Sequence, residues 1–459
     1  MTASGPDERL APDEPAAPIP PGTPSTPGAP SRRGAFASLQ PLRHRNFALL
    51  WSGGLVSVIG SWMQTVAVGA LVVAHTGQAL WAVLVAAGAF LPTGILSPVG
   101  GALADRFPRK PWLVLGNLAA AAVALGIAAL VATRQDSPSV LTLLVTVQGS
   151  VSALTSPFQQ AILPDLVPRR EFLAASSLGS AQFNLGRVIG PALAGATIAV
   201  FGYPVAFLAN AISFLAVVLA LVFIRLSPPP GPREGETLLS SLGRGWRAAR
   251  GTPACTAAIG TIAVVALLAS PFIALVPAMA DHVAHGSARR LASATGVLTT
   301  AQGVGAVLGA LLLAPLALRF GRGRVLVASL CLLPLVLVVY ATSSTLAFAT
   351  VALFAVGLVY IGVLSGLSTL VQLSAPQEFR GRILSIYLVA LGVAYPIGSL
   401  AQGPLADRIG LGWTTAASAL SLALILAAVR LVRPSWLAPL VADPGQARQT
   451  ALAAGRPYP

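Results

Sequence analysis

Twelve long apolar segments constrain the fold of this chain more than any other feature of its sequence. Hydrophobic residues make up 55% of its 459 residues and charged residues only 9%, which a soluble globule could not reach without exposing large apolar patches. Each segment is long enough for a helix across a hydrocarbon layer roughly 30 Å thick. The sequence therefore predicts an all-α membrane protein with twelve transmembrane helices, near residues 46–74, 80–104, 111–132, 139–163, 174–200, 204–225, 254–280, 291–317, 324–342, 346–372, 383–405 and 412–432.

The chain divides near its middle, where Pro228, Pro229 and Pro230 end the sixth segment and a charged stretch follows. Within that stretch, leucines and Trp246 recur at helical spacing, which predicts an interfacial helix before the seventh segment. We expect five parts: a disordered Pro/Ala-rich cytoplasmic tail at 1–40, a six-helix half at 41–226, a cytoplasmic linker with the interfacial helix at 227–253, a second six-helix half at 254–433, and a second cytoplasmic tail at 434–459.

Sequence identities between the two halves indicate an internal repeat. They recur at a single offset of 208 positions without a gap, in the pairs Pro168 and Pro376, Gly195 and Gly403, and Gly202 and Gly410. Each identity is weak by itself because glycine is common in this chain, but the shared register is informative. Two pseudo-symmetric six-helix halves that face each other across a midplane site are a known transporter architecture.

The basic residues gather in the loops of one face. The chain carries 29 Lys and Arg against 14 Asp and Glu, for a net charge of +15. If the N-terminus is cytoplasmic, all but five of these cations are cytoplasmic; the exceptions are Arg134, Arg289, Arg290 and Arg408 on the far face and Arg187 inside a segment. This positive-inside bias predicts a multi-pass protein of an inner or plasma membrane with both termini cytoplasmic, and it argues against a nucleic-acid partner.

Three short motifs resemble a known family. The loop after the second segment reads GGALADRFPRK at 100–110, the first segment carries GSWMQ at 60–64, and the fifth carries NLGRVIGP at 184–191. Together they resemble the major facilitator superfamily, in its branch of bacterial exporters related to the enterobactin exporter and the transmembrane secretion effector family. The resemblance covers about residues 40–435 and implies the twelve-helix major facilitator fold.

The loop motif predicts a gate made of Gly101, Asp105, Arg106, Arg109 and Asp165. Asp105 lies among cations at a cytoplasmic helix end, and Asp165 ends the fourth segment on the same side, so a cluster of Asp105, Arg109 and Asp165 is geometrically feasible. The alternative is a charged reverse turn that serves only the positive-inside rule.

The resemblance adds a second contact for this gate. It implies that Asp105 meets the N-terminus of the eleventh segment near Arg382, where the helix dipole favours an anion, and so closes the cytoplasmic side in the outward-facing state. Two departures from the family pattern stand out: Pro108 replaces a usual glycine, and the corresponding loop of the second half, at 318–322, has no acid. The gate is therefore expected on one side only.

The fifth segment is expected to act as a hinge through Gly186, Gly190, Pro191 and Gly195. Glycines four and five apart permit close helix contacts, and the proline removes a backbone hydrogen bond. The stretch resembles the antiporter motif of the superfamily, although Ala194 stands where a glycine is usual. The alternative is ordinary tight packing in a glycine-rich membrane helix.

Polar residues at helical spacing predict the substrate pathway. The candidates are Gln64, Gln148, Ser152, Thr155, Asn184 and Arg187. Arg187 is the one formal charge deep inside an apolar segment, and a charge near the bilayer midplane is costly and faces the protein interior or a wet cavity. The alternatives are interhelical hydrogen bonding for the amides and hydroxyls, and bracing of backbone carbonyls for Arg187.

Together these features favour an exporter of amphipathic small molecules, such as a drug, a siderophore or a secondary metabolite, that works by alternating access as a functional monomer in the lipid bilayer. No acid lies centrally in a segment, so proton antiport, if used, depends on helix-end acids such as Asp281 or Asp407. An importer or facilitator on the same fold and a membrane sensor without transport remain alternatives. An enzyme is not expected because no nucleophile, base or metal cluster occurs at depth, and Cys255 and Cys331 match no metal spacing, so we expect no metal and no cofactor.

Overall fold

The computed structural model describes residues 39–224, 246–284 and 286–441. Every regular element in these residues is a helix, and twelve of the spans are long and apolar enough to cross a membrane. The first half holds α2 (Arg45–Thr76), α3 (Ala79–Ala104), α4 (Arg109–Ala132), α5 (Pro138–Leu166), α6 (Phe172–Phe201) and α7 (Tyr203–Phe223), with the short helices η1 (Gln40–Arg43) and η2 (Arg169–Glu171). The second half holds α9 (Pro253–Leu268), α10 (Phe272–Ala284), α11 (Ala288–Phe320), α12 (Arg322–Ala341), α13 (Leu346–Ser374), α14 (Arg380–Ile409), α15 (Leu411–Val432) and α16 (Pro434–Val441).

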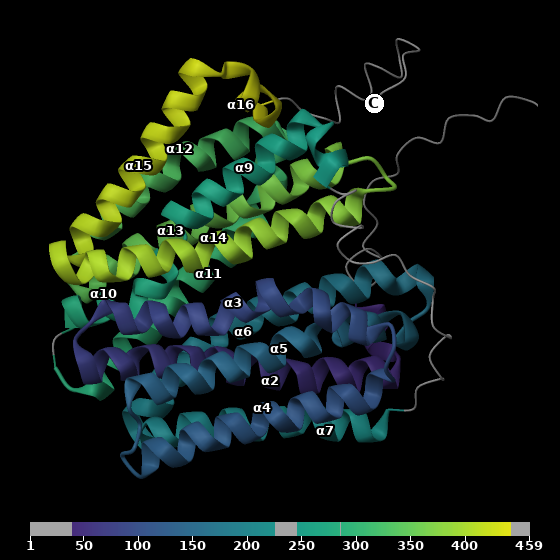
Figure 1. Ribbon diagram of the computed structural model, residues 1–459, viewed down its shortest axis with the longest axis vertical. Helices are drawn as coiled ribbons and strands as arrows, with labels where there is room; N and C mark the ends of the chain where they lie inside the picture. Colours follow the sequence, from purple (N-terminus) through teal and green to yellow (C-terminus); the bar gives the residue numbers. More distant parts are fainter. Residues whose placement is uncertain (1–38, 225–245, 285, 442–459) are drawn as a thin grey trace, which may run out of the picture.

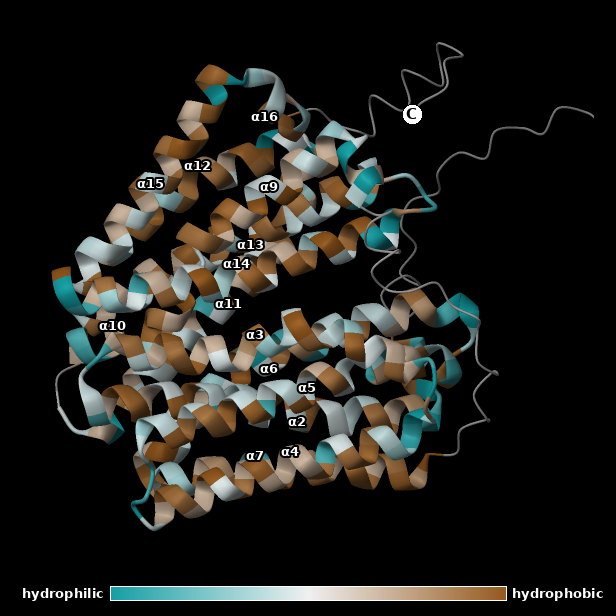
Figure 2. Cartoon of the chain, in the orientation of Figure 1, coloured by the Kyte–Doolittle hydropathy of each residue, from teal (hydrophilic) through white to brown (hydrophobic). Residues whose placement is uncertain are grey.

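The predicted all-α membrane fold with twelve spanning helices is confirmed. The helices form two bundles, α2–α7 and α9–α16, which lie one above the other in Figure 1. Hydrophobic residues cover the middle of the helices, and hydrophilic residues gather at the two ends of the bundles (Figure 2). This distribution is the one that a bilayer imposes on helices that cross it.

The seventh predicted segment is two helices rather than one. Helix α9 ends at Leu268, and α10 begins at Phe272. Pro271 lies in the break and has no N–H to continue the helix, and Ser270 uses its hydroxyl for a 2.7 Å hydrogen bond to the Tyr360 hydroxyl of α13. The two helices together still span the membrane as one unit, Pro253–Ala284.

The ends of the chain differ in part from the expected division. The second tail was expected to begin at residue 434, but residues 434–441 form α16, which contacts α9, α12 and α15 and buries Leu440. The tail at 1–38, most of the interfacial helix predicted in the linker, and residues 442–459 lie outside the described residues. Of that linker, residues 246–250 are helical.

Two helix pairs carry most of the contact between the halves. Helix α3 packs on α14, and α6 packs on α11, while α2 and α3 also touch α10 and α11. We name the two ends of the molecule by their loops. The α3–α4 end holds the loop at 105–108, and the α2–α3 end holds the turn at 77–78.

Candidate functional site

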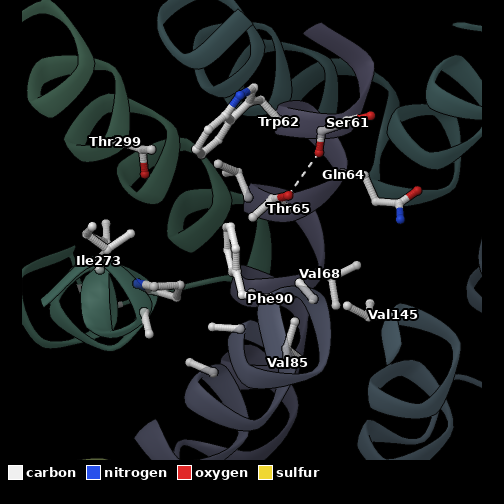
Figure 3. A pocket seen from close by; sticks show the side chains of 18 of the residues that line it. Ser61, Trp62, Gln64, Thr65, Val68, Val85, Phe90, Val145, Ile273 and Thr299 are labelled. Atoms are coloured by element: carbon white, nitrogen blue, oxygen red, sulfur yellow. Dashed lines mark hydrogen bonds between the residues drawn. The ribbon is translucent and has the colours of Figure 1, made fainter. Parts of the chain in front are cut away.

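A cavity of about 190 Å³ lies between the two halves. Side chains from α2, α3, α5, α7, α10, α11 and α14 line it, and Figure 3 shows Trp62 and Thr65 of α2, Phe90 of α3 and Thr299 of α11 around it. Its wall is mostly apolar, with valines and alanines beside a few amides and hydroxyls. Such a lining suits solutes that combine an apolar body with hydrogen-bonding groups.

Three amide side chains, Gln64, Gln148 and Asn210, line the cavity. Asn210 of α7 is fully buried and donates from Nδ2 to Gln64 Oε1 at 2.7 Å, and the Ser213 hydroxyl donates to Asn210 Oδ1 at 3.0 Å. This chain of bonds holds the Gln64 amide in one orientation. Gln148 of α5 differs, because its Oε1 is buried and has no hydrogen-bond partner among the described residues. An unsatisfied acceptor in a cavity wall is available to a solute donor.

Aromatic rings cross the boundary between the halves at the cavity. Phe90 of α3 meets Tyr395 of α14 edge-to-face at 5.6 Å between ring centroids, and both line the cavity. Trp62, also in the wall, packs edge-to-face on Phe183 of α6 at 5.7 Å. Because Phe90 and Tyr395 belong to different halves, a relative movement of the halves changes the shape of the cavity.

The structure places the other predicted pathway residues apart from this cavity. Gln64, Gln148 and Ser152 line it, but Thr155, Asn184 and Arg187 do not. The Thr155 hydroxyl bonds back to the Val151 carbonyl, and its side chain lies against Gly116 of α4. The Asn184 side chain donates to the Ser180 carbonyl of its own helix at 2.8 Å.

Arg187 lies in the middle of α6 at the boundary with α11. A Cβ placed on Gly303 of α11 would stand 3.1 Å from the Arg187 carbonyl oxygen, so the backbones are close there. The Arg187 side chain is largely buried and has no hydrogen bond or ion pair with a described residue. It is therefore a central cation that the described residues leave without a counter-ion.

The predicted hinge residues of α6 lie between α2 and α11. A Cβ on Gly190 would stand 2.7 Å from the Ile59 carbonyl oxygen of α2, and Gly186 packs on Val58 and Trp62 of the same helix. On the other side, a Cβ on Gly296 of α11 would stand 2.6 Å from the Pro191 carbonyl oxygen. Helix α6 runs through Pro191 without a break.

Further along this boundary, Gly195 of α6 lies against Ser293 of α11, where a Cβ would stand 3.3 Å from the serine Cα. The small residues of α6 therefore allow close approach on two faces, one within the first half and one between the halves. The same positions thus serve tight packing and, in our interpretation, the sliding of one half on the other.

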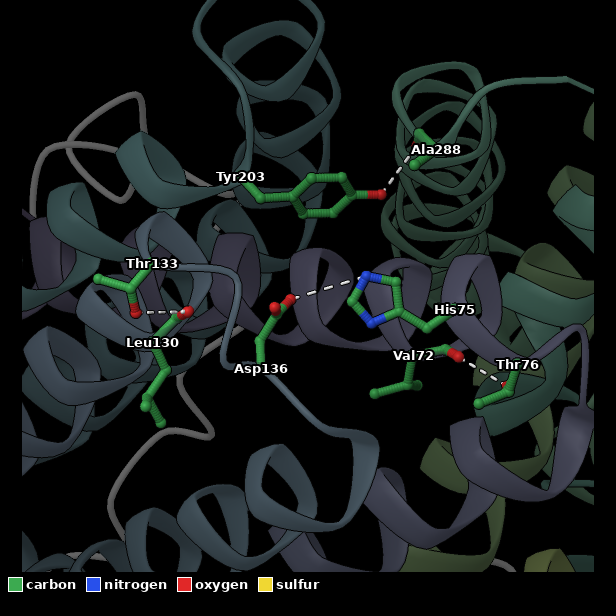
Figure 4. Close-up of polar contacts among 8 residues, drawn as sticks. All are labelled: Val72, His75, Thr76, Leu130, Thr133, Asp136, Tyr203 and Ala288. Carbon is green, nitrogen blue, oxygen red and sulfur yellow. Dashed lines mark hydrogen bonds and ion pairs between the residues drawn. The ribbon is translucent and has the colours of Figure 1, made fainter.

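Hydrogen bonds that join described residues of the two halves lie at the α2–α3 end. The Tyr203 hydroxyl of α7 donates to the Ala288 carbonyl of α11 at 2.8 Å (Figure 4). Asp407 of α14 accepts from the backbone N–H groups of Ala79 and Leu80 at the start of α3. By contrast, the His75–Asp136 ion pair in the same view, at 3.7 Å, stays within the first half.

At the α3–α4 end the predicted gate residues form contacts within the first half. Arg109 and Asp165 form an ion pair, and Lys110 donates to the Ile224 carbonyl at 2.8 Å. Asp105 and Arg106 are exposed in the loop after α3, and the Asp105 carboxylate has no hydrogen bond or ion pair with a described residue. Toward this end, α3 and α14 draw apart in Figure 1.

Gly101, the remaining gate candidate, does not make the close contact. A Cβ on Gly101 would meet nothing within 4 Å, whereas a Cβ on its neighbour Gly100 would stand 2.9 Å from the Ala153 carbonyl oxygen of α5. The packing requirement in the last turns of α3 therefore falls on Gly100.

Two residues that line the cavity and one buried ion pair were missed in the sequence. Asn210 and Tyr395 lie singly in apolar segments, and a search for isolated polar residues at depth would have found both. Glu171 is buried at the start of α6 and pairs with His44 Nε2 at 2.8 Å. No sequence pattern indicates this pair, because its partners lie 127 positions apart.

The family described as transmembrane secretion effector matches residues 36–442. The multidrug efflux pump Tap of Mycolicibacterium fortuitum is 27% identical over 385 residues, which cover 82% of this chain and 93% of Tap. The enterobactin exporter EntS of Escherichia coli O1:K1 / APEC is 28% identical over 316 residues, which cover 67% of this chain and 72% of EntS. Among solved structures, a bacterial homologue of the iron transporter ferroportin in an inward-facing state shares the fold, with a TM-score of 0.63 at 18% identity, 86% of this chain and 99% of that chain being covered.

Proposed function

The chain belongs to the transmembrane secretion effector family of major facilitator efflux transporters, and from that premise we propose that it exports amphipathic small molecules by alternating access. The observation that carries the proposal is the asymmetry of the boundary between the halves. Polar contacts join the halves at the α2–α3 end, while the charged loop at the α3–α4 end makes its ion pair within one half. A cavity between two halves whose described hydrogen bonds join them at one end supports an inward-facing state in an alternating-access cycle.

The cavity wall and Arg187 support a solute with an apolar body and an anionic or strongly hydrogen-bonding group. Gln148 offers an unsatisfied acceptor in the wall, and the Arg187 guanidinium lacks a described counter-ion. A largely buried cation near the midplane is stabilised when a solute anion pairs with it. Siderophores and acidic secondary metabolites have this chemistry, and the names of the relatives include a siderophore exporter and a multidrug pump.

We propose that the α3–α4 end faces the cytoplasm, with both termini on that side of a bacterial plasma membrane. The cations of this end, among them Arg106, Arg109, Arg169, Arg322 and Arg382, support this orientation through the positive-inside rule. In this orientation, the end at which described hydrogen bonds join the halves faces away from the side from which an exporter takes its substrate.

Flux in everted membrane vesicles tests the proposal. Vesicles that contain the protein are expected to accumulate an amphipathic dye or an anionic siderophore in their lumen, and vesicles without it are not. Uptake into right-side-out vesicles with no uptake into everted ones would favour the importer alternative. Absence of flux in both orientations for the whole solute panel would contradict transport of this class.

Proton antiport is the coupling that we propose for this export. The membrane-spanning segments hold no central carboxylate among the described residues, so the helix-end acids are the candidates. Nigericin, which collapses the pH gradient, should abolish accumulation, whereas valinomycin alone should reduce it less. Accumulation that persists in nigericin would exclude a proton gradient as the driving force.

A further inference from the structure

The carboxylate of Asp407 joins the two halves at the α2–α3 end. It lies in the last turn of α14, and its two oxygens accept hydrogen bonds from the backbone of α3: Oδ1 from the Ala79 N–H at 2.6 Å and Oδ2 from the Leu80 N–H at 3.0 Å. Both donors are at the start of α3, where backbone N–H groups have no partner within the helix. The carboxylate therefore satisfies two helix donors from the opposite half of the molecule.

Helix α3 depends on this contact because it has no cap of its own. Its N-cap residue, Gln78, makes no side-chain capping bond. An acidic group at a helix N-terminus interacts favourably with the helix dipole, and hydrogen bonds to a charged acceptor are stronger than neutral ones. Gly403, one turn before Asp407, brings α14 close to α3, since a Cβ there would stand 3.3 Å from the Leu80 Cα.

The sequence around Asp407 repeats the loop motif of the first half. Residues 101–106 read GALADR and residues 403–408 read GPLADR. Because α3 and α14 pack antiparallel, with Ala79 near Asp407 and Gly94 near Val393, the two motifs lie at opposite ends of the same helix pair. Asp105 ends α3 at the same end of the pair as the start of α14, and the N-cap of α14, Phe379, also lacks a side-chain capping bond.

We propose that Asp407 is the positioning residue that holds the α2–α3 end closed, and that it alternates with Asp105. In the state described, the Asp407 carboxylate caps α3 and the Asp105 carboxylate has no described partner. In the opposite state, Asp407 leaves Ala79 and Leu80, and Asp105 caps the start of α14. Each half thus contributes one acid, and the two acids lie at opposite ends of the α3–α14 pair. This inference rests on the proposed transport cycle.

The proposed alternation predicts opposite effects of Asp407→Asn and Asp105→Asn on the populations of the two states. Asp407→Asn keeps the size of the side chain but removes the charge and one of the two acceptors, so it should favour opening of the α2–α3 end. Asp105→Asn should favour the state described here. Asp136→Asn is the matched control, because Asp136 lies at the same end as Asp407 but pairs with His75 inside the first half (Figure 4).

Distances between pairs of spin labels measure the populations of the two states, and this measurement does not depend on flux. The labels are placed on cysteines at Ser139 and Ser344 for the α2–α3 end, and at Gln160 and Gln377 for the α3–α4 end, all of which are exposed. The background carries Cys255→Ala and Cys331→Ala. We expect Asp407→Asn to raise the ratio of the state open at the α2–α3 end to the state closed there roughly tenfold, which is about 1.4 kcal/mol. Asp105→Asn should lower the ratio, and Asp136→Asn should leave it unchanged.

A second variant breaks the same contact without changing a charge. Ala79→Pro removes the N–H that Oδ1 accepts, and proline is tolerated at the first position of a helix. It should shift the distances in the same direction as Asp407→Asn. Unchanged distances in both variants, or an equal shift in Asp136→Asn, would overturn the proposal. If the wild-type protein transports no solute while the distances shift as expected, the proposed function fails and the Asp407 contact stands.

Discussion

Two arginines of the first half show how location decides the role of a charge. Arg109 lies at a helix end and forms an ion pair with Asp165, whereas Arg187 lies in the middle of α6 and has no ion pair with a described residue. A side chain at a helix end can reach interfacial water, but one at mid-helix depends on the protein or on a bound solute. The partner of Arg109 accounts for the first charge, and the proposed function assigns an anionic solute group to the second.

Substitution of Arg187 should therefore affect transport more than folding. We expect Arg187→Gln to lower the flux of an anionic solute at least tenfold, since a hydrogen bond to a charged group contributes about 1.5–3 kcal/mol. Arg187→Lys should retain part of the flux, because it keeps the charge but loses the planar fork of donors. Initial rates in everted vesicles measure both effects, with Arg134→Gln as a control at an exposed arginine. An equal loss for all solutes, with a lower melting temperature, would show that Arg187 only braces helices.

The proposed gating role of Asp105 predicts a separate effect on transport. Asp105→Asn should impair export while insertion remains normal, because the change removes the gate charge without changing the size of the side chain. Export rates, normalised to the amount of protein in the membrane, measure the effect. Export at the wild-type rate would rule out a gating role for this carboxylate.

At the scale of elements, α6 is the helix that packs closely on a helix of its own half and on a helix of the other half. Its glycines bring it against α2 inside the first half and against α11 across the boundary. Side chains larger than hydrogen at these positions would separate the backbones, and membrane helices depend on close backbone approach because lipid offers no hydrophobic driving force between them.

Adding a single methyl group at one of these glycines should therefore lower the stability of the protein. Gly190→Ala places a Cβ 2.5 Å from the Trp62 Cβ and 2.7 Å from the Ile59 carbonyl oxygen, so α2 and α6 must move apart. We expect a loss of about 1–3 kcal/mol of stability, as for other overpacked cores. Gly126→Ala in α4 is the control, because its Cβ would meet nothing within 4 Å and alanine favours helix. Thermal unfolding in detergent compares the two; equal melting temperatures would contradict the packing argument.

For the whole molecule, access to the central cavity should depend on the side from which a reagent arrives. Described hydrogen bonds of Tyr203 and Asp407 join the halves at the α2–α3 end, and in the proposed cycle the cavity is reached from the other end. This asymmetry is a property of the two halves together, and neither bundle alone has it.

Thiol labelling tests the access route. A cysteine at Gln148, in a background without Cys255 and Cys331, should react with a hydrophilic reagent added from the cytoplasmic side, and bound solute should protect it. A cysteine at Thr155 should not react, because that position is buried against α4 rather than in the cavity wall. No labelling at Gln148 from either side would move the pathway away from this face of α5.

The sequence by itself determined the membrane class, the twelve spans and the family, because apolar length and short motifs are local properties that a bilayer selects directly. It also identified Gln64, Gln148 and Ser152, whose helical spacing places them on the cavity side of their helices. Only the tertiary structure decided that Thr155 and Asn184 face elsewhere, that Glu171 pairs with His44, and that Asp407 caps α3. These outcomes depend on the rotation of each helix about its axis and on contacts between residues far apart in the chain, which hydropathy and spacing do not encode.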